Sequence, residues 1–182
     1  MKGEAMKHRS AKTLMQSFCS TNILYLDIRE PFVIGRWIYA TDGCIIIRVE
    51  KAQAPITSHT IDAGFVKSIE DFYPKANRTL RAIPVEMLRD LQPKKRSAHW
   101  KTGENFILIR GTLFQWKYIR KLIDVADTVG TDEVKVVKFG TVNAARASGH
   151  MLMRVKIGGY DIGIMPCRWT EEAESSATRL PL

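Results

Sequence analysis

The chain has 182 residues, 45% of them hydrophobic, and a net charge of +9. This length suits one domain with an elaboration, and the composition is ordinary for a globular protein with its own core. No apolar run approaches the roughly 18 residues that cross a bilayer, and no apolar stretch follows the basic first residues, so we expect neither a membrane helix nor a secretion signal. The positive charge favours a polyanionic partner, of which nucleic acid is the commonest.

The three cysteines, Cys19, Cys44 and Cys167, lie far apart in the sequence. An odd number with no Cys-x-x-Cys pair argues against a disulfide framework and favours free thiols in a reducing cytoplasm. The four histidines are scattered without the spacing of metal ligands. We therefore expect a cytoplasmic protein with no metal site and no cofactor.

The first predicted element is a helix that begins near Ser10. An apolar stripe with helical spacing follows this residue, which is itself a good N-cap. The stripe consists of Ala11, Leu14, Met15, Phe18 and Cys19. The opposite side of the helix carries no acid, and residues 1–9 before it form a basic segment.

Strands are predicted next. Residues 23–29 alternate as in a strand, and two apolar runs, FVIGRWIYAT and CIIIRVE, flank the pair Asp42-Gly43. This pair predicts a hairpin, because a type I′ turn needs positive φ at both central residues. We interpret residues 51–80 as an irregular insert, and we expect a short helix at Ile83–Leu91.

The second half begins with a strand at residues 105–111, followed by the clearest helix, FQWKYIRKLIDVADTVG, which Gly130 would end. A further strand and a hairpin turned at Gly158-Gly159 come next. We expect the polar, aperiodic residues 170–182 to be disordered. The order of elements predicts an α+β fold rich in antiparallel hairpins, with a hint of internal repetition.

The long helix has an unusual order of charges. Its polar face carries Lys117, Arg120 and Lys121 in the first turns and Asp124 and Asp127 in the last. This order opposes the helix macrodipole, so helix stability does not explain the cations. They indicate either a face that binds a polyanion or a solvated face with pairs four residues apart, and the helix alone leaves both interpretations open.

Four segments, taken in order, resemble the bacterial DNA sliding clamps, the beta subunit of DNA polymerase III. YATDGCIII is similar to the family's A-T-D-G-H-R-L signature, and DFYPKANRTL is loosely similar to its F-P-x-Y segment. LFQWKYIRKLIDVADTVGTDEVKVV resembles the F-N-x-x-Y-L helix with its strand, and YDIGIMPCRW resembles the M-P-M-R-L strand. The short length is similar to that of clamp-like proteins of phages and prophages.

The resemblance implies an α+β DNA clamp domain, with antiparallel sheets and two main helices on one face. It would cover residues 10–169 as a single elaborated domain. Clamps hold duplex DNA through phosphate electrostatics without reading its sequence. The DNA-facing residues that the resemblance implies are Lys7, Arg9, Lys12, Lys117, Arg120 and Lys121.

In full-length clamps the A-T-D-G and M-P-M-R-L segments form the walls of a pocket that binds short peptides of polymerases and the clamp loader. The matching residues are Thr41, Gly43, Met165, Pro166 and Arg168. Cys44 and Ile45 replace the family's His-Arg, and Cys167 replaces its second Met. In a lone clamp domain we expect the two walls to meet only across an interface between protomers.

We therefore expect a non-catalytic processivity factor whose partners are duplex DNA, polymerase or clamp-loader peptides, and other copies of the chain. The alternative is a clamp-fold adapter or inhibitor that binds replication proteins without encircling DNA. The sequence has no Gly-rich phosphate loop, serine elbow or H-E-x-x-H motif that would indicate an enzyme. It also has no helix-turn-helix or zinc signature of another kind of DNA-binding domain.

Overall fold

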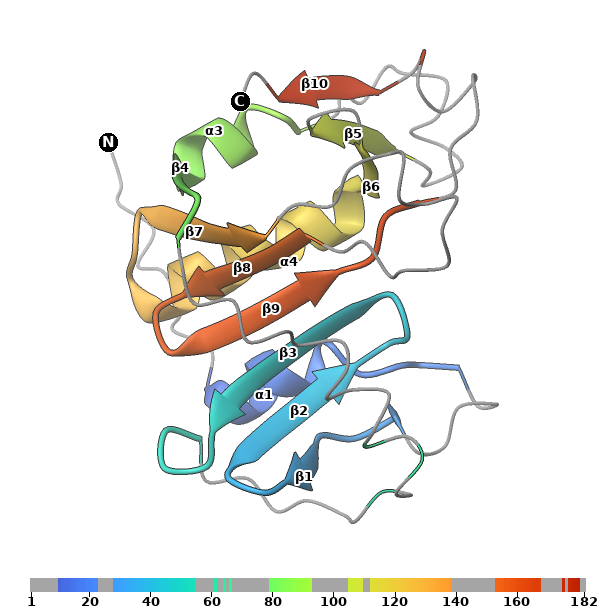
Figure 1. Ribbon diagram of the computed structural model, residues 1–182, viewed down its shortest axis with the longest axis vertical. Helices are drawn as coiled ribbons and strands as arrows, with labels where there is room; N and C mark the ends of the chain where they lie inside the picture. Colours follow the sequence, from blue (N-terminus) through green and yellow to red (C-terminus); the bar gives the residue numbers. More distant parts are fainter. Residues whose placement is uncertain are drawn as a thin grey trace, which may run out of the picture.

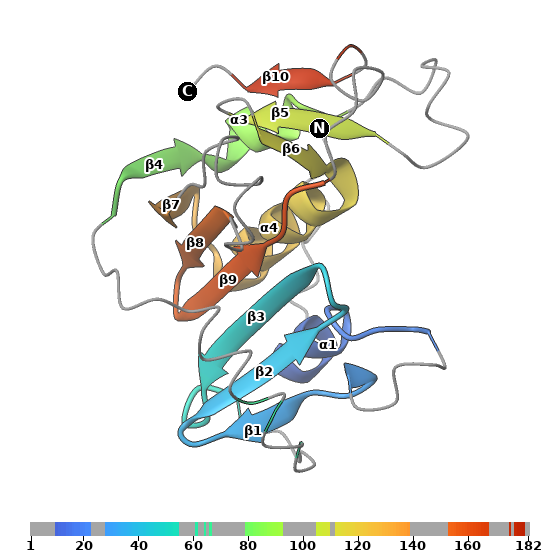
Figure 2. The ribbon, with the colours of Figure 1, turned by 45° about the vertical axis from the view of Figure 1, so that its right-hand side comes forward.

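A seven-stranded antiparallel sheet dominates the fold (Figure 1). The computed structural model describes residues 10–22, 28–54, 79–92, 105–109, 112–138, 153–167 and 177–180, with residues 61, 64, 66 and 175. Two of its helices pack on this sheet, and a smaller three-stranded sheet lies beside it (Figures 1 and 2). The predicted α+β class with antiparallel pairing is confirmed.

The elements follow one another in a simple order. The first half contains α1 (Ala11–Gln16), β1 (Phe32–Ile34), β2 (Trp37–Thr41), β3 (Ile45–Glu50), β4 (Arg81–Pro84) and α3 (Val85–Arg89). The second half contains β5 (Phe106–Ile109), β6 (Thr112–Gln115), α4 (Trp116–Val129), β7 (Glu133–Lys138), β8 (Met153–Ile157), β9 (Tyr160–Ile164) and β10 (Thr178–Leu180).

The first six strands of the large sheet repeat one arrangement twice. Its strands run β1-β2-β3-β9-β8-β7-β4, so the first six form two sets of three that meet at the antiparallel pair β3 and β9. A helix precedes each set in the chain, α1 before β1 and α4 before β7. Ile47 lies opposite Ile162 at this junction. The described part of the chain thus contains two similar half-units that share one sheet.

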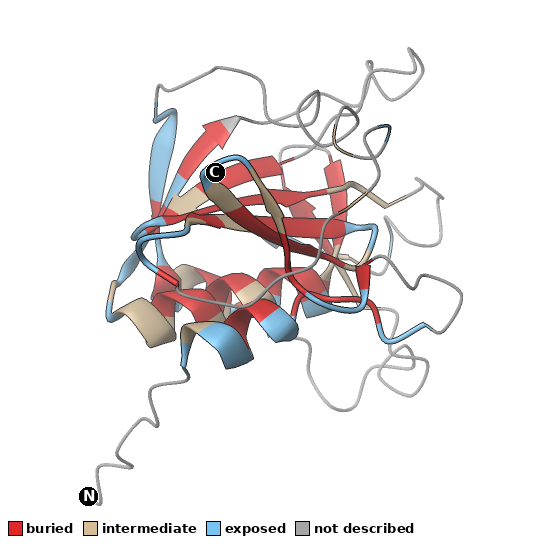
Figure 3. Cartoon of the chain, turned by 90° about the horizontal axis from the view of Figure 1, so that it is seen from below, coloured by how far each residue is buried: buried red, intermediate tan, exposed pale blue. Residues whose placement is uncertain are grey.

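The two main helices cover the same face of this sheet (Figure 3). Leu14 and Met15 of α1, with Phe18 just after it, join Ile119 and other apolar residues of α4 in one buried cluster with the inward residues of the strands. Exposed positions of both helices lie on the side that faces away from the sheet (Figure 3). This arrangement follows from the helical spacing of the apolar residues, which leaves one polar side on each helix.

Both helix ends that the sequence predicts are confirmed. The Ser10 side chain accepts a hydrogen bond from the Thr13 amide at 3.2 Å and caps α1. Gly130 ends α4 in the left-handed conformation, with φ of 69°. Among the described residues, no helix has both the length and the apolar character needed to span a bilayer.

Three predictions about the elements need correction. FVIGRWIYAT is two strands instead of one, because Gly35 turns the chain with φ of 56° between β1 and β2. The beginning of the predicted long helix is β6, and Ile83-Pro84 belongs to β4. Most of the predicted strand at residues 23–29 and most of the insert at 51–80 lie outside the described residues, and the described Ile28 and Arg29 belong to no strand.

The prediction of a disordered tail is wrong for Thr178–Leu180. These residues form β10, which pairs in parallel with β5 in the smaller sheet. The Leu180 side chain is buried in the main core. One apolar side chain and a row of backbone hydrogen bonds therefore order a segment whose composition alone indicated disorder.

Candidate nucleic-acid interface

Three of the six predicted DNA-facing residues expose their side chains on the helix layer. Lys12 lies on α1, and Lys117 and Arg120 lie on the first half of α4. The surface over α1 is hollowed by a shallow, open depression of about 390 Å³. Lys12, Thr13, Gln16 and Ser17 line it. Lys7 and Arg9 lie outside the described residues.

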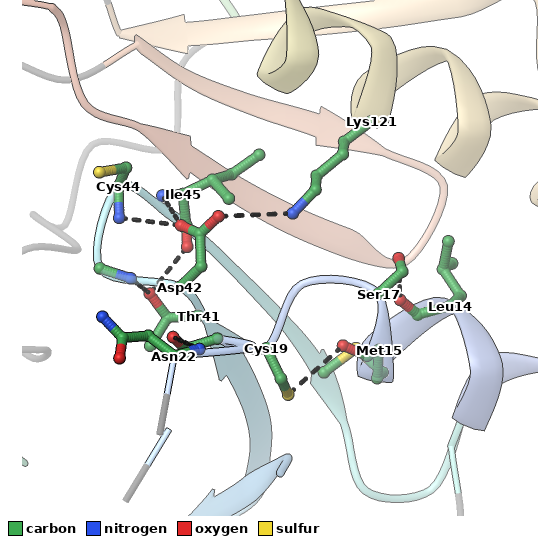
Figure 4. Close-up of polar contacts among 12 residues, drawn as sticks. Leu14, Met15, Ser17, Cys19, Asn22, Thr41, Asp42, Cys44, Ile45 and Lys121 are labelled. Carbon is green, nitrogen blue, oxygen red and sulfur yellow. Dashed lines mark hydrogen bonds and ion pairs between the residues drawn. The ribbon is translucent and has the colours of Figure 1, made fainter. Parts of the chain in front are cut away.

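Lys121 differs from the other cations of α4, because its ammonium group is already engaged. Its Nζ lies 3.6 Å from Oδ2 of Asp42, at the tip of the β2–β3 hairpin (Figure 4). It also lies 5.0 Å from the centroid of the ring of Phe18, which follows α1. About one fifth of each charged side chain is exposed, 21% for both Lys121 and Asp42. Lys121 thus connects α4, the segment that follows α1 and the hairpin.

The surroundings of Lys121 act on its pKa in opposite directions. Burial lowers this pKa because it removes water from the ammonium group, and the nearby charge of Lys117 lowers it further. The Asp42 carboxylate opposes both effects. Burial prevails, so the pKa of Lys121 lies below its ordinary value. Asp42 is thus the counter-ion that favours the ammonium form.

An acid at the far end of α4 also has a partner. Asp127 forms an ion pair with Arg89 of α3, and the same guanidinium lies 3.0 Å from Glu86. Asp127 thus helps to attach α3 to α4. The acid near the end of α4 therefore has a structural role. Its partner is on α3 and is not one of the cations in the first turns of α4.

The hairpin tip is held by side chains of the A-T-D-G stretch (Figure 4). Oδ1 of Asp42 accepts hydrogen bonds from the amides of Cys44 and Ile45 at 3.0 and 3.1 Å. The Thr41 hydroxyl donates to the Ile45 carbonyl at 2.7 Å and accepts from the Gly43 amide at 3.0 Å. Side chains therefore satisfy most of the polar backbone of this turn.

The centre of this turn differs from our prediction by one residue. Thr41 lies opposite Ile46, and the Asp42 amide donates to the Ile45 carbonyl at 3.3 Å. The two central residues are therefore Gly43, with φ of 91°, and Cys44, instead of Asp42 and Gly43. Asp42 precedes the turn and closes it with its carboxylate.

The second predicted pocket wall lies beside this tip. The Met165 amide donates a hydrogen bond to the Cys44 carbonyl at 2.8 Å, where the chain leaves β9. Two residues further on, the Cys167 amide donates to the Leu113 carbonyl at 2.8 Å. The structure thus brings Cys44 of the hairpin turn next to Met165 within one chain, so our expectation that the two walls meet only across protomers is wrong. Arg168 lies outside the described residues.

Sequence reasoning missed what two residues of this region do, Tyr118 and Asp42. Tyr118 is buried beneath the tip, where burial raises its pKa and a hydrogen bond links its side chain to Cys44. Asp42 had only a turn role in our prediction, yet it also neutralises Lys121. No spacing rule connects residues 42 and 121, because a contact over such a distance in the sequence depends on the packing of whole elements.

The three thiols are expected to react with a thiol reagent in a clear order. Cys44 is exposed, whereas burial raises the pKa of Cys167 to about 11 and that of Cys19 to about 12. Since the thiolate is the reactive form, at pH 8 about a thousandth of Cys167 and a ten-thousandth of Cys19 can react. Absorbance with Ellman's reagent should show one fast thiol, absent in Cys44→Ser. A fast reaction in that variant would contradict the described burial.

Among the described residues, no group of three or more His, Cys, Asp or Glu side chains could hold a metal ion. A scan against models of protein families and a search of curated proteins found no match to this chain.

Proposed function

We propose that this protein is a non-catalytic, clamp-like factor that binds duplex DNA through the exposed side of α1 and α4. The observation that carries the proposal is the position of Lys12, Lys117 and Arg120, which are exposed on two helices that cover one face of the sheet. We call this surface the helix face. The net charge of +9 supports a polyanionic partner.

The symmetry of the sheet also supports a clamp-like role. Two half-units, each with one helix and three strands, place both helices in a single layer. Such a layer offers cations to a phosphate backbone over a broad surface, without inserting any element into a groove. Binding of this kind is independent of sequence and depends strongly on salt. The resemblance to sliding clamps implies the same mode of binding, in a cytoplasmic protein of phage or prophage type.

Fluorescence anisotropy with two labelled duplexes of unrelated sequence tests this proposal. We expect equal affinities for both and a plot of log K against log salt with a slope of roughly −3 to −5, since each neutralised phosphate contributes about −0.9. A slope near −3 corresponds to the three exposed cations of the helix face, and a slope near −5 adds Lys7 and Arg9. No binding at 50 mM salt, or a strong preference for one sequence, would overturn the proposal.

A second candidate function is that of an adapter or inhibitor that binds replication proteins without encircling DNA. The observation that favours it is the contact between Met165 and Cys44, which places both segments of a clamp-like peptide pocket side by side in one chain. Light scattering at micromolar concentration separates the two candidates. A ring of single-domain subunits needs several copies, so a strict monomer would exclude the ring and favour the adapter.

A further inference from the structure

We propose that Asp42 limits the DNA affinity of the helix face by holding Lys121 away from phosphate. This inference rests on the proposed function, since it concerns the same surface. It adds an electrostatic role for an acid in the hairpin turn, where the sequence indicated only a turn residue.

The first argument is the position of Lys121 on α4. It lies one turn beyond Lys117 and directly after Arg120, and both of these residues are exposed. Side chains four residues apart lie on the same side of a helix, so Lys121 belongs to the same polar side as Lys117. Its side chain nevertheless points to the hairpin tip (Figure 4). Its Nζ also lies 5.0 Å from the centroid of the Phe18 ring.

Second, the Lys121 ammonium group already has a counter-ion. The Lys121 ammonium is partly buried and lies 3.6 Å from the Asp42 carboxylate. Phosphate must compete with this carboxylate for the ammonium group. Lys121 therefore contributes little to DNA binding while Asp42 is charged, and it becomes an additional phosphate contact when that charge is removed.

The third argument is that Asp42 uses its two carboxylate oxygens for different purposes. Oδ1 accepts the hydrogen bonds of the turn, and Oδ2 forms the ion pair with Lys121. Asparagine keeps an accepting oxygen in the Oδ1 position, removes the charge and replaces Oδ2 with an NH2 group that cannot accept from Lys121. Asp42→Asn is therefore a variant that preserves the turn and releases the cation.

The experiment is a double-mutant cycle of Asp42→Asn and Lys121→Gln, with duplex affinity measured between 50 and 200 mM salt. We expect Asp42→Asn to bind about five- to tenfold more tightly at 100 mM salt, with a slope steeper by about 0.9. Lys121→Gln alone should change affinity less than about twofold, and it should abolish most of the gain. Asp132→Asn, which changes the net charge equally at an exposed position beyond α4, is the matched control.

A readout without DNA accompanies the cycle. Amine labelling followed by mass spectrometry should modify Lys121 slowly in the wild type and several-fold faster in Asp42→Asn, with both proteins folded as judged by circular dichroism. If the wild type binds duplex DNA and Asp42→Asn binds no more tightly, or if its gain persists with Lys121→Gln, the inference is overturned. A lack of duplex binding by all variants would instead overturn the proposed function, and the inference with it.

Discussion

The double variant Lys117→Glu/Arg120→Glu is expected to lose duplex DNA affinity by on the order of a hundredfold at 100 mM salt. Both side chains are exposed on the first half of α4, so their reversal removes two cations and adds two anions at the surface that we assign to DNA. The slope of log K against log salt should become shallower by about 1.8, because two phosphate contacts are lost. Anisotropy titrations at four salt concentrations measure both quantities.

The outer face of the sheet provides a matched control. Lys135 of β7 and Lys156 of β8 lie opposite each other. Their neighbours Val134, Val136 and Val155 point into the core beneath the helices, so both lysines lie on the other side of the sheet. Lys135→Glu/Lys156→Glu changes the net charge by the same amount and should reduce affinity less than about fivefold. Equal losses in the two double variants would mean that net charge, and no particular face, governs binding.

Replacement of Asp161 by alanine is expected to lower the free energy of unfolding by about 3–5 kcal/mol. Asp161 is 5% exposed and accepts a hydrogen bond from Nε of Arg154, which is itself 2% exposed, at 2.8 Å. A terminal nitrogen of Arg48 lies 2.9 Å from its other oxygen. Without the carboxylate, two guanidinium groups are left close together without their shared counter-ion. Urea unfolding followed by circular dichroism measures the loss.

The control for this prediction is an exposed ion pair at the end of β3 in the same sheet. Glu50 lies 3.8 Å from Arg36, with 43% and 75% of the side chains exposed. Glu50→Gln should cost less than about 1 kcal/mol, because water screens such pairs. Stability of Asp161→Ala within 1 kcal/mol of the wild type would contradict the account of this buried cluster.

Much of the fold could be predicted from local patterns. The cap at Ser10, the stop at Gly130 and the hairpin at Gly158-Gly159 all follow from the chemistry of a few adjacent residues, and the structure confirms each of them. The apolar stripes of the two main helices also predicted which sides become buried. Local sequence carries this information because helices and tight turns depend on neighbours in the chain.

The features that sequence could not predict depend on distant contacts. β10 forms because β5 offers an open edge and the core accepts Leu180, and nothing within residues 170–182 reveals either condition. The pairing of Asp42 with Lys121 and the clustering of Arg48, Arg154 and Asp161 depend in the same way on the order of strands in the sheet.

The candidate site illustrates the same distinction. The sequence identified the cations of α4, and the structure exposes Lys117 and Arg120 among them. It could not show that Lys121 already has an acidic partner from the hairpin. It also misled us about the pocket segments, which adjoin within one chain through the pairing of β3 with β9.

NMR spectra of the 15N-labelled protein with a short duplex test most directly whether the helix face contacts DNA. We predict that the largest amide shift changes cluster at Lys12, Lys117 and Arg120, grow on titration and disappear at high salt. Changes centred on Lys135 and Lys156 of the outer face, or no changes at 50 mM salt, would contradict the account.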